Sequence, residues 1–561
     1  TLKNVEKEKI TVETEILSPD GQKVTSKKNE GRINHGQPFT QNFIVENPQL
    51  WSPETPVLYQ AVSKIYVDGQ LTDTYTTRFG IRSIEFMADK GFFLNGKHRK
   101  FQGVCNHHDL GPLGAAINVS ALRHQLTLLK DMGCDAIRTA HNMPAPELVS
   151  LCDEMGFMMM IEPFDEWDIA KCDNGYHRYF HEWAEKDMVN MLQQYRNHPC
   201  VVMWSIGNEV PTQCSAEGYK VAKFLQDICH REDPTRPVVY WTTDLPPCST
   251  FRDSTTGHTV MRKPISGCHK TWCWVPRPPL LSAPAACINS LPNGKQTPNM
   301  KTISRLPTTW NTARGPIFPT STSPWQTTMN GPWDSLYGPA STTWANPVRT
   351  TRTHGPTTVP CSVSLTWPLF RKTATTCTVV YGTSRQKPCT FSRTGTGKDG
   401  KVRKCPNHQT VENRYRLMWP HAIYEPGEVK VVAYDETGTA QAEKTIRTAG
   451  KPHHIELVPA QKSLKADGKD LAYVTVRIVD KDGNLCPTDM RLVRFKVKGA
   501  GSYKASANGD PTCLDLFHLP QMHAFNGMLT TIVQAGEKNG ILELEATAKG
   551  LQAGKIQISI K

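Results

Sequence analysis

The sequence lacks any run of apolar residues long enough to cross a membrane, and none of its cysteines form Cys-x-x-Cys pairs. A transmembrane helix needs about 20 mostly apolar residues, so no membrane span is expected. The 17 cysteines are scattered along the chain without zinc spacing. We expect most of them to be buried free thiols, because free cysteine behaves as a small hydrophobic residue. With 561 residues, 38% of them hydrophobic, the chain is long enough for three or four domains.

Glutamate is absent between Glu232 and Glu412, and the charge is uneven. The net charge is +13, but residues 241–402 carry 18 Lys and Arg against 4 Asp and Glu. The rest of the chain has 47 basic and 48 acidic residues. The basic residues of this segment are scattered and no nucleic-acid motif accompanies them, so no nucleic-acid partner is expected. A Thr/Pro-rich linker and a basic nucleic-acid tail remain alternative interpretations of the segment, which holds 20 of the 41 prolines.

The first 86 residues show the alternation of β-strands. "KITVETEIL" alternates apolar and polar residues, and "SPDGQKV" supplies a turn. "LYQAVSKIYVDGQLTDTYTTRFG" predicts a hairpin that turns at Asp68 and Gly69. We therefore predict an immunoglobulin-like β-sandwich over residues 1–86. Because the chain begins at Thr1 inside a predicted strand, we expect that targeting information has been removed.

From about residue 87 to 241, short apolar strands alternate with amphipathic helices. "ALRHQLTLLKDMG" places Leu122, Leu126 and Leu129 on one helical face, and Gly133 ends the helix. The strands, "FQGVCN", "CDAIRTA", "FMMMIEPF", "VVMWSIGNEV" and "RPVVYW", are nearly all apolar. This pattern is typical of a parallel sheet whose two faces are covered by helices.

Polar side chains gather directly after these strands. In a (β/α)₈ barrel the carboxyl ends of the strands form the active-site face. A doubly wound sheet would place ligands there too, but no glycine-rich phosphate loop follows the first strand. We therefore predict a (β/α)₈ TIM barrel over residues 87–402. The polar groups are Asn106, His107 and His108; His141 and Asn142; Asp165 and Glu166; and Asn208 and Glu209.

Strand-like alternation returns near residue 413. "EVKVVAYDETG", "AYVTVRIVDKDGN", "RLVRFKVKG" and "GILELEATAKG" predict strands joined by Gly and Asp turns. We expect two further sandwiches that divide near Gly450, a remnant over residues 403–450 and an immunoglobulin-like domain over 451–561. The predicted fold class is therefore multidomain, β plus α/β.

One segment contains a motif that is specific enough to indicate a function. "YRNHPCVVMWSIGNEV" ends a buried strand with Asn208 and Glu209, and it stands with "GVCNHHDLG", "IRTAHNMP" and "FFLNGK". Together these four motifs resemble glycoside hydrolase family 2, the β-galactosidase and β-glucuronidase group. The resemblance covers residues 1 to about 240 and about 405 to 561, and the motifs keep the family's order and spacing.

The resemblance assigns roles to five residues. It makes Glu209 the general acid/base and places Asn208 on the sugar 2-hydroxyl. It also places His107 and His141 on sugar hydroxyls and Arg138 near the nucleophile. The chemistry agrees, because a retaining glycosidase needs a carboxylic acid and a second carboxylate about 5–5.5 Å away. Two carboxylates that close raise the pKa of one of them, which keeps the acid protonated near neutral pH.

Other polar residues on the same rim receive no role. These are Glu162, Asp165 and Glu166, while His108 and His198 are interpreted as structural. The family's metal-ligand pattern is not clearly matched, so we assign no metal ligand and no required cofactor. The resemblance allows a divalent cation.

The nucleophile is missing from the sequence. The family expects a glutamate in a pattern like "GSETAS" after a later barrel strand, and residues 241–402 contain no glutamate. "TWCWVPRPPLLSAPAACINSLP", residues 271–292, can be written in codons that also read "MVLGSETASTVSSRGVYKFP" one frame over. In that frame the codon of the nucleophile overlaps the codons of Pro276 and Arg277.

Two further segments also give family-like sequences when their codons are read one frame over. "PWDSLYGPASTTWANP" gives "MGQFVWTGFDYLGEP", and "FRDSTTGHTVMRKPISGCHK" gives "PGFNYRTHRYEEAYQRLPQ". Synonymous codons do not leave enough freedom to create three ordered family-like segments in one register. We therefore interpret residues 241–402 as a frameshifted reading that replaces the second half of the barrel.

The predicted function is that of a retaining exo-β-glycosidase acting on terminal β-linked sugars, with a β-galactoside-type oligosaccharide or glycoconjugate as the favoured substrate. The chain as written is expected to be inactive, because its nucleophile is lost. β-Glucuronidase and β-mannosidase remain open within the family, and a non-catalytic carbohydrate-binding or adhesion β-sandwich protein is the rival from another class. The family resemblance suggests a bacterial periplasmic or secreted location, whereas the oligomeric state is left open.

Overall fold

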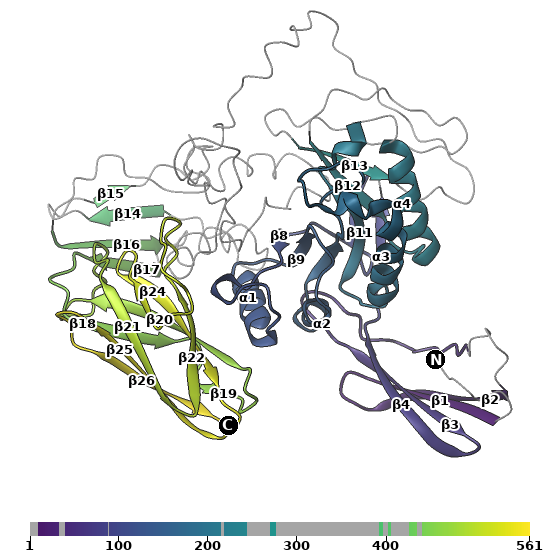
Figure 1. The fold of residues 1–561 in the computed structure, drawn as a ribbon, viewed down its shortest axis with the longest axis horizontal. Coiled ribbons are helices and arrows are strands. Elements are labelled where there is room, and N and C mark those ends of the chain that lie inside the picture. Colours follow the sequence, from purple (N-terminus) through teal and green to yellow (C-terminus); the bar gives the residue numbers. More distant parts are fainter. Residues whose placement is uncertain are drawn as a thin grey trace, which may run out of the picture. The chain divides into compact units, whose positions relative to one another are not determined.

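The computed structural model divides into two compact units, which are described separately (Figure 1). Among the described residues, the first unit comprises those from 9 to 103 and from 135 to 275, and the second comprises those from 104 to 134 and from 392 to 561. Pro276, Arg277 and most of the segment interpreted as frameshifted lie outside the described residues. The structure describes residues 9–32, 40–87, 89–214, 218–243, 270–275, 392–396, 402–404, 426–434 and 440–561.

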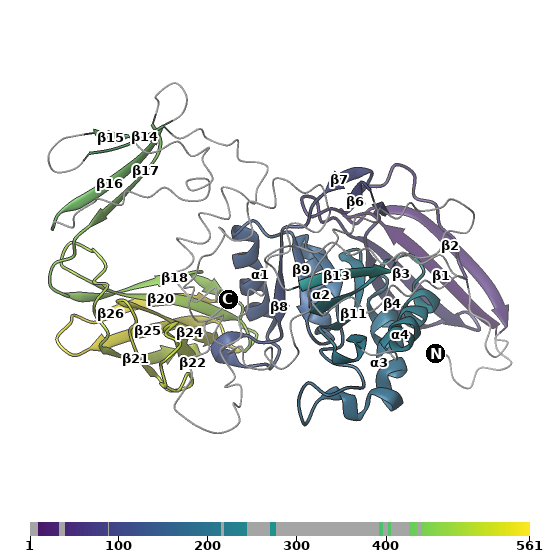
Figure 2. The ribbon, with the colours of Figure 1, turned by 90° about the horizontal axis from the view of Figure 1, so that it is seen from above.

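An antiparallel sheet ordered β2-β1-β3-β4 opens the first unit (Figure 2). Asp68 and Gly69 join β3 to β4 as predicted, with φ of 47° and 84°. Positive φ at both central residues is the type I′ geometry that matches the twist of a hairpin. The strands are β1 (Lys9–Leu17), β2 (Lys23–Arg32), β3 (Tyr59–Val67) and β4 (Gln70–Phe79).

This sheet is joined to the following α/β region by buried polar contacts. The Trp51 indole is fully buried, and its Nε1 donates to the carbonyl of Asp153 at 2.9 Å. The Arg82 guanidinium donates to the carbonyls of Pro199 and Val201 at 2.7 and 2.6 Å. The two parts therefore form one unit. Three short strands lie between them, β5 (Ile84–Met87), β6 (Gly91–Leu94) and β7 (Lys97–Arg99).

The α/β region, residues 135–243, has the predicted alternation of strands and helices. Neighbouring strands from β9 to β12 are parallel, and β13 pairs with β12 in the antiparallel sense. Every residue of β9, β10 and β11 is buried, which explains their continuous apolar sequence. Figure 1 shows α3 and α4 side by side next to β11 and β12.

The elements of this region follow one another in a regular order. They are β9 (Ala136–Ala140), α2 (Pro146–Met155), β10 (Met158–Ile161), η2 (Tyr176–Arg178), α3 (Phe180–Tyr195), β11 (Val201–Asn208), η3 (Pro211–Cys214), α4 (Gly218–Glu232), β12 (Val238–Thr243) and β13 (Lys270–Val275).

The second unit begins within β8 (Gly103–His107) and continues through η1 (Gly111–Leu113) into α1 (Val119–Asp131). The predicted leucine face of α1 is buried. The Asn118 side chain caps the helix by accepting a hydrogen bond from the backbone N–H of Ala121 at 2.9 Å.

Helix α1 packs against the C-terminal sandwich of the same unit. Ser120 Oγ donates to Asp470 at 2.7 Å, and the Asn118 amide donates to the Lys469 carbonyl at 3.0 Å. The rings of His124 and Tyr473 stack with their centroids 3.9 Å apart. The sandwich therefore holds the first barrel helix in place.

The C-terminal sandwich consists of two facing sheets (Figure 2), ordered β18-β20-β24-β22 and β19-β26-β25-β21-β23. Its core is apolar. The strands are β18 (His454–Pro459), β19 (Ser463–Leu464), β20 (Leu471–Val479), β21 (Leu492–Gly499), β22 (Gly501–Ala507), β23 (Gln521–His523), β24 (Met528–Ala535), β25 (Gly540–Ala548) and β26 (Gly554–Ile560).

A separate sheet of order β15-β14-β16-β17 precedes this sandwich in the chain. The domain limits predicted at 403–450 and 451–561 stay predictions; β14 and the first residue of β15 lie before residue 403. The strands are β14 (Ser392–Thr396), β15 (Val402–Lys404), β16 (Glu428–Tyr434) and β17 (Ala440–Arg447).

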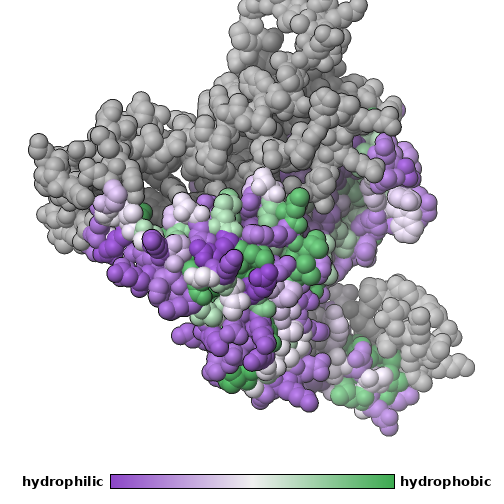
Figure 3. All heavy atoms as spheres, turned by 60° about the vertical axis from the view of Figure 1, so that its left-hand side comes forward, coloured by the Kyte–Doolittle hydropathy of each residue, from purple (hydrophilic) through white to green (hydrophobic). Residues whose placement is uncertain are grey.

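On the face that Figure 3 presents, hydrophilic residues cover most of the described surface and hydrophobic residues form smaller patches between them. None of the helices in the described ranges combines the length and hydropathy that a bilayer span requires. Cysteines whose side chains the structure describes include six buried free thiols, at positions 105, 134, 152, 200, 229 and 486, while Cys172 and Cys513 are free thiols with more exposure. This agrees with the expectation drawn from their scattered positions.

Candidate active site

Three neighbouring parallel strands end in polar residues at one edge of the sheet. β9 is followed by His141, β10 by Glu162, and β11 ends with Asn208 and is followed by Glu209. Arg138 lies inside β9 and is only 4% exposed. The parallel registers bring the carboxyl ends of these strands together, as the predicted barrel requires.

Glu162 is the centre of the cluster. Its carboxylate is fully buried and accepts hydrogen bonds from the Arg138 guanidinium, with Nη2 at 2.7 Å from Oε2 and 2.9 Å from Oε1. It also accepts from Ser205 Oγ and contacts His141 Nδ1 at 2.6 Å. Burial raises the pKa of Glu162, but the charge of Arg138 and the bonds from His141 and Ser205 outweigh burial and lower it.

Arg138 also orients Asn208. Its Nη2 donates to Asn208 Oδ1 at 2.9 Å, and Asn208 Nδ2 donates to Asp165 Oδ1 at 3.0 Å. An amide with a guanidinium on one side and a carboxylate on the other has one favourable orientation. The second N–H of Asn208 Nδ2 is therefore directed by the protein before any ligand binds.

Glu209 follows β11 with φ of 48° and is partly buried. A non-glycine residue rarely adopts positive φ unless its surroundings impose it, and such residues cluster at functional sites. Lys171 supplies part of that support, because its Nζ donates to the carbonyl of Asn208 at 2.5 Å and to Asp165 Oδ1 at 2.9 Å.

The other side of the strand end is fixed by Trp167. Its Nε1 donates to the carbonyl of Ile206 at 2.7 Å. A Cβ atom at Gly207 would lie 2.7 Å from the same Nε1, so only glycine fits beneath the indole. The Gly-Asn-Glu order thus has a local reason: glycine admits the indole, and the next two residues carry the polar groups.

The loop that delivers Lys171 folds around the Glu166 carboxylate. This carboxylate accepts from the backbone N–H groups of Lys171 and His177 at 2.6 and 2.8 Å, and it contacts His177 Nδ1 at 2.9 Å. Burial raises the pKa of Glu166, and these hydrogen bonds lower it. A Cβ atom at Gly175 would meet Glu166 Oε1, so glycine is required there.

Four of the predicted site residues, Arg138, His141, Asn208 and Glu209, lie in this cluster. The fifth, His107, lies at the carboxyl end of β8 and is partly buried. His107 belongs to the second compact unit, whereas the other four residues belong to the first.

Sequence reasoning gave no role to Glu162, Asp165, Lys171 and Ser205, which hold the cluster together. Glu162 carries a recognisable signal, because it is the first charged residue after a buried strand, next to the strand that ends before His141. Lys171 carries none, since it lies in an irregular loop.

The divalent cation that the resemblance allows finds no donor set here. Among the described residues, no three His, Cys, Asp or Glu side chains are arranged to hold a metal ion. Glu166, the buried carboxylate nearest in sequence to Asp165, is occupied by the amides of its own loop. We derive no step through a metal.

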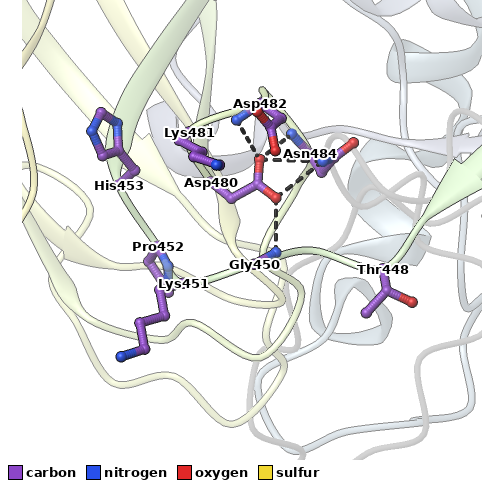
Figure 4. Close-up of a pocket in the computed structure, with 9 residues that line it drawn as sticks. All are labelled: Thr448, Gly450, Lys451, Pro452, His453, Asp480, Lys481, Asp482 and Asn484. Atoms are coloured by element: carbon purple, nitrogen blue, oxygen red, sulfur yellow. Dashed lines mark hydrogen bonds between the residues drawn. The ribbon is translucent and has the colours of Figure 1, made fainter. Parts of the chain in front are cut away.

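A pocket of about 400 Å³ lies in the second unit, beside the segment that enters the C-terminal sandwich (Figure 4). Asp480 points into a turn there and accepts from the backbone N–H groups of Gly450, Asp482 and Asn484 at 2.8 to 2.9 Å. These bonds hold the pKa of Asp480 well below its usual range. Its carboxylate is thus used to fix the chain, which indicates a structural joint.

Family comparisons match four stretches of the chain. Residues 1–82 match the model "Glycosyl hydrolases family 2", and residues 86–261 match its TIM barrel domain. Residues 397–442 match a domain of unknown function, DUF4982, and residues 455–557 match glycoside hydrolase family 2 C-terminal domain 5.

Curated relatives agree with these matches. The chain is 32% identical to the β-galactosidase BoGH2A of Bacteroides ovatus over 98% of its own length and 72% of that protein. It is 38% identical to a putative β-glucuronidase of Formosa agariphila, over 40% of this chain and 20% of that protein.

Solved structures show the same fold. A glycosyl hydrolase family 2 member from Bacteroides cellulosilyticus has a TM-score of 0.73 at 21% identity, over 99% of this chain and 75% of that one. A β-glycosidase from Bacteroides vulgatus has a TM-score of 0.71 at 22% identity over the same shares. With a relative that is 32% identical over 98% of this chain and 72% of its own length, and with family 2 models matched in order along the chain, the chain belongs to glycoside hydrolase family 2, a family of β-glycosidases.

Proposed function

We propose that the cluster around Glu162 is the acid/base half of the active site of a retaining exo-β-glycosidase, with Glu209 as general acid/base and terminal β-galactosides as the favoured substrates. The observation that carries the proposal is the position of Asn208 and Glu209. They end a buried parallel strand, and Arg138, Asp165 and Lys171 fix the first of them on three sides.

In this arrangement each residue has a separate task. The Glu209 carboxyl protonates the leaving glycosidic oxygen and later takes a proton from water. The Asn208 amide, already bonded to Arg138 and Asp165, offers its second N–H to a sugar hydroxyl. His141 offers its ring to another hydroxyl, and His107 is proposed for the same task.

Glu162 does not serve as the nucleophile. A nucleophilic carboxylate must reach the anomeric carbon, but Glu162 is fully buried. Its two oxygens already accept from Arg138 and Ser205 and contact His141. The nucleophile must therefore come from a later strand, where the present reading frame encodes Pro276 and Arg277.

We further propose that the chain as written does not hydrolyse glycosides. The barrel match ends at residue 261 and the next match begins at 397, which supports a shifted frame between them. The decisive comparison uses the chain as written and the chain with its frame restored over residues 241–402. On nitrophenyl β-galactoside we expect the restored chain to be faster by about 10⁴-fold or more, the scale on which removing a nucleophile acts.

Two controls make this result specific. Glu209→Gln in the restored chain should remove most of the gained activity, since the acid/base is then absent. Equal turnover by the two chains, or full activity of the Glu209→Gln variant, would refute the proposal. Resequencing the source DNA across residues 235–410 tests the frameshift independently of any assay.

The sugar specificity is a finer proposal. It is supported by a relative that aligns over 98% of this chain and is named a β-galactosidase, while two relatives that align over 40% of it are named a putative β-glucuronidase and a β-glucuronidase. Nitrophenyl galactoside, glucuronide and mannoside compared on the restored chain decide among the three. A preference for the glucuronide or mannoside would reassign the substrate and leave the roles of Glu209 and Asn208 unchanged.

A non-catalytic carbohydrate-binding function is the competing proposal. It places the sugar site on the sandwiches, and sugar binding would then survive deletion of residues 87–410. We expect that deletion to abolish sugar binding, because the oriented polar groups lie on β9, β10 and β11.

A periplasmic or secreted location is also proposed, and fractionation of the producing cells tests it.

A further inference from the structure

The contacts of Glu162 specify which nitrogen of the His141 ring carries the proton. Oε1 lies 2.6 Å from His141 Nδ1 and accepts from Arg138 Nη2 at 2.9 Å. Oε2 accepts from Arg138 Nη2 and Nε at 2.7 and 3.2 Å and from Ser205 Oγ. With both oxygens beside a permanent cation and no exposed surface, this carboxyl is held as a carboxylate.

A carboxylate only accepts hydrogen bonds. The 2.6 Å contact therefore requires the proton of His141 to be on Nδ1. In a neutral imidazole the other nitrogen is then an acceptor, so Nε2 presents a lone pair. The direction of the Glu162 pKa agrees, since Arg138, His141 and Ser205 together lower it despite burial.

We propose that Glu162 is a positioning residue that fixes His141 in the Nδ1–H tautomer, so that His141 Nε2 accepts a hydrogen bond from a sugar hydroxyl. The statement about the sugar rests on the proposed glycosidase function, whereas the statement about the tautomer does not. The same carboxylate holds Arg138, which orients Asn208. One buried group thus sets two sugar-contacting side chains, one as acceptor and one as donor.

The chain contains its own reference histidines. His198 Nδ1 lies 2.5 Å from Asp153 Oδ2, a carboxylate away from the cluster, and is expected in the same tautomer. His108 Nε2 lies 3.0 Å from the carbonyl of Ala115. Because a carbonyl also only accepts, His108 is expected in the opposite tautomer, with its proton on Nε2.

The tautomers are measured by ¹H–¹⁵N correlation spectra of the full chain, deuterated and labelled with ¹⁵N-histidine, at about pH 8. His141→Asn, His198→Asn and His108→Asn assign the three signals. We expect a protonated Nδ1 and an unprotonated Nε2 for His141 and His198, and the reverse for His108. A His141 signal with the proton on Nε2 would overturn the proposal without any variant of Glu162.

The role of Glu162 is then tested by Glu162→Gln, with Glu166→Gln as the matched control. A glutamine can donate or accept, so we expect His141 to become a mixture of tautomers while His198 and His108 keep theirs. Glu166→Gln should change His177 alone, because Glu166 contacts that ring and not His141. An unchanged His141 in a folded Glu162→Gln chain would show that another group sets the tautomer.

A titration with sugar tests the inference about His141 separately from the proposed function. Methyl β-D-galactopyranoside is added to the chain with its frame restored, and the His141 Nε2 signal is followed. We expect a saturable shift, and an affinity about tenfold weaker in the Glu162→Gln variant, the scale of a hydrogen bond with a charged group. Absence of any shift with the Nδ1–H tautomer intact would remove the sugar contact and count against the proposed function, while the positioning of His141 by Glu162 would stand.

Discussion

The α/β region buries an ion pair in addition to its apolar core, whereas the core cluster of the C-terminal sandwich is apolar. That cluster is built of residues such as Val476, Leu529 and Leu544, all fully buried. The buried ion pair of the α/β region joins Arg138, inside β9, to Glu162, which follows β10. Burying charges is expensive and adds little stability, so a fold gains nothing from it as scaffolding. The contrast supports the proposal that the active site lies in the α/β region.

The two regions also differ in the contacts that hold their backbone and side chains in position. In the sandwich, strands are held by ladders and by close packing between two sheets. In the cluster, orientation depends on directed bonds such as Arg138 to Asn208 and Lys171 to Asp165. Directed bonds specify where a side chain points, which apolar packing does less sharply.

The largest expected effect comes from breaking the buried ion pair. Arg138→Leu leaves the Glu162 carboxylate buried beside fewer donors, and we expect a loss of about 4 kcal/mol of stability. Amide hydrogen exchange read by mass spectrometry should accelerate in β9, β10 and β11. Arg231→Leu, at an exposed ion pair with Glu185, is the matched control and should have a much smaller effect on stability, because solvent screens exposed charges. Equal exchange in the two variants would contradict the contrast between the regions.

Truncation of a buried apolar side chain is expected to cause the second largest loss of stability, and this loss should be confined to the sandwich. Leu544→Ala removes a fully buried side chain from β25 and leaves a cavity, with an expected loss of about 3 kcal/mol. Ile541→Ala lies on the same strand but is half exposed, so it should cost far less. Exchange in β24 to β26 measures both, and a larger effect of Ile541→Ala would show that the core has been misassigned.

The smallest effect is expected at the partly exposed ion pair of Glu54 and Arg99, which precede the α/β region in the chain. Burial raises the pKa of Glu54, but hydrogen bonds and charge from Arg99 lower it to about 2. Because the folded pKa lies below the ordinary value of 4.5, the pair stabilises the fold above pH 4.5. That stabilisation is lost as the pH falls toward 2.

Glu54→Gln should therefore lower the melting temperature at neutral pH and match the unmodified chain near pH 2. We expect a difference below about 1 kcal/mol, since solvent screens these partly exposed side chains. Glu182→Gln, at an exposed pair with Lys186, should show no such convergence. A gap that persists at pH 2 would mean that Glu54 acts through its shape and not its charge.

Much of the fold followed from local pattern. The turn at Asp68 and Gly69 and the leucine face of α1 were both predicted from a few neighbouring residues. The parallel order of β9 to β12 followed from continuous apolar strands separated by helices. These features depend on short-range sterics and on periodicity, which a sequence displays directly.

The amino-acid sequence was enough to indicate the family and the strands that carry Arg138, His141, Asn208 and Glu209 within or next to them, and it contains no glutamate between Glu232 and Glu412. The three-dimensional fold was needed to show that Glu162 contacts two of these residues and that Lys171 supports the carbonyl of Asn208. A hydrogen bond between groups 24 or 37 positions apart depends on how the strands and loops are arranged in space, and spacing along the chain does not encode that arrangement.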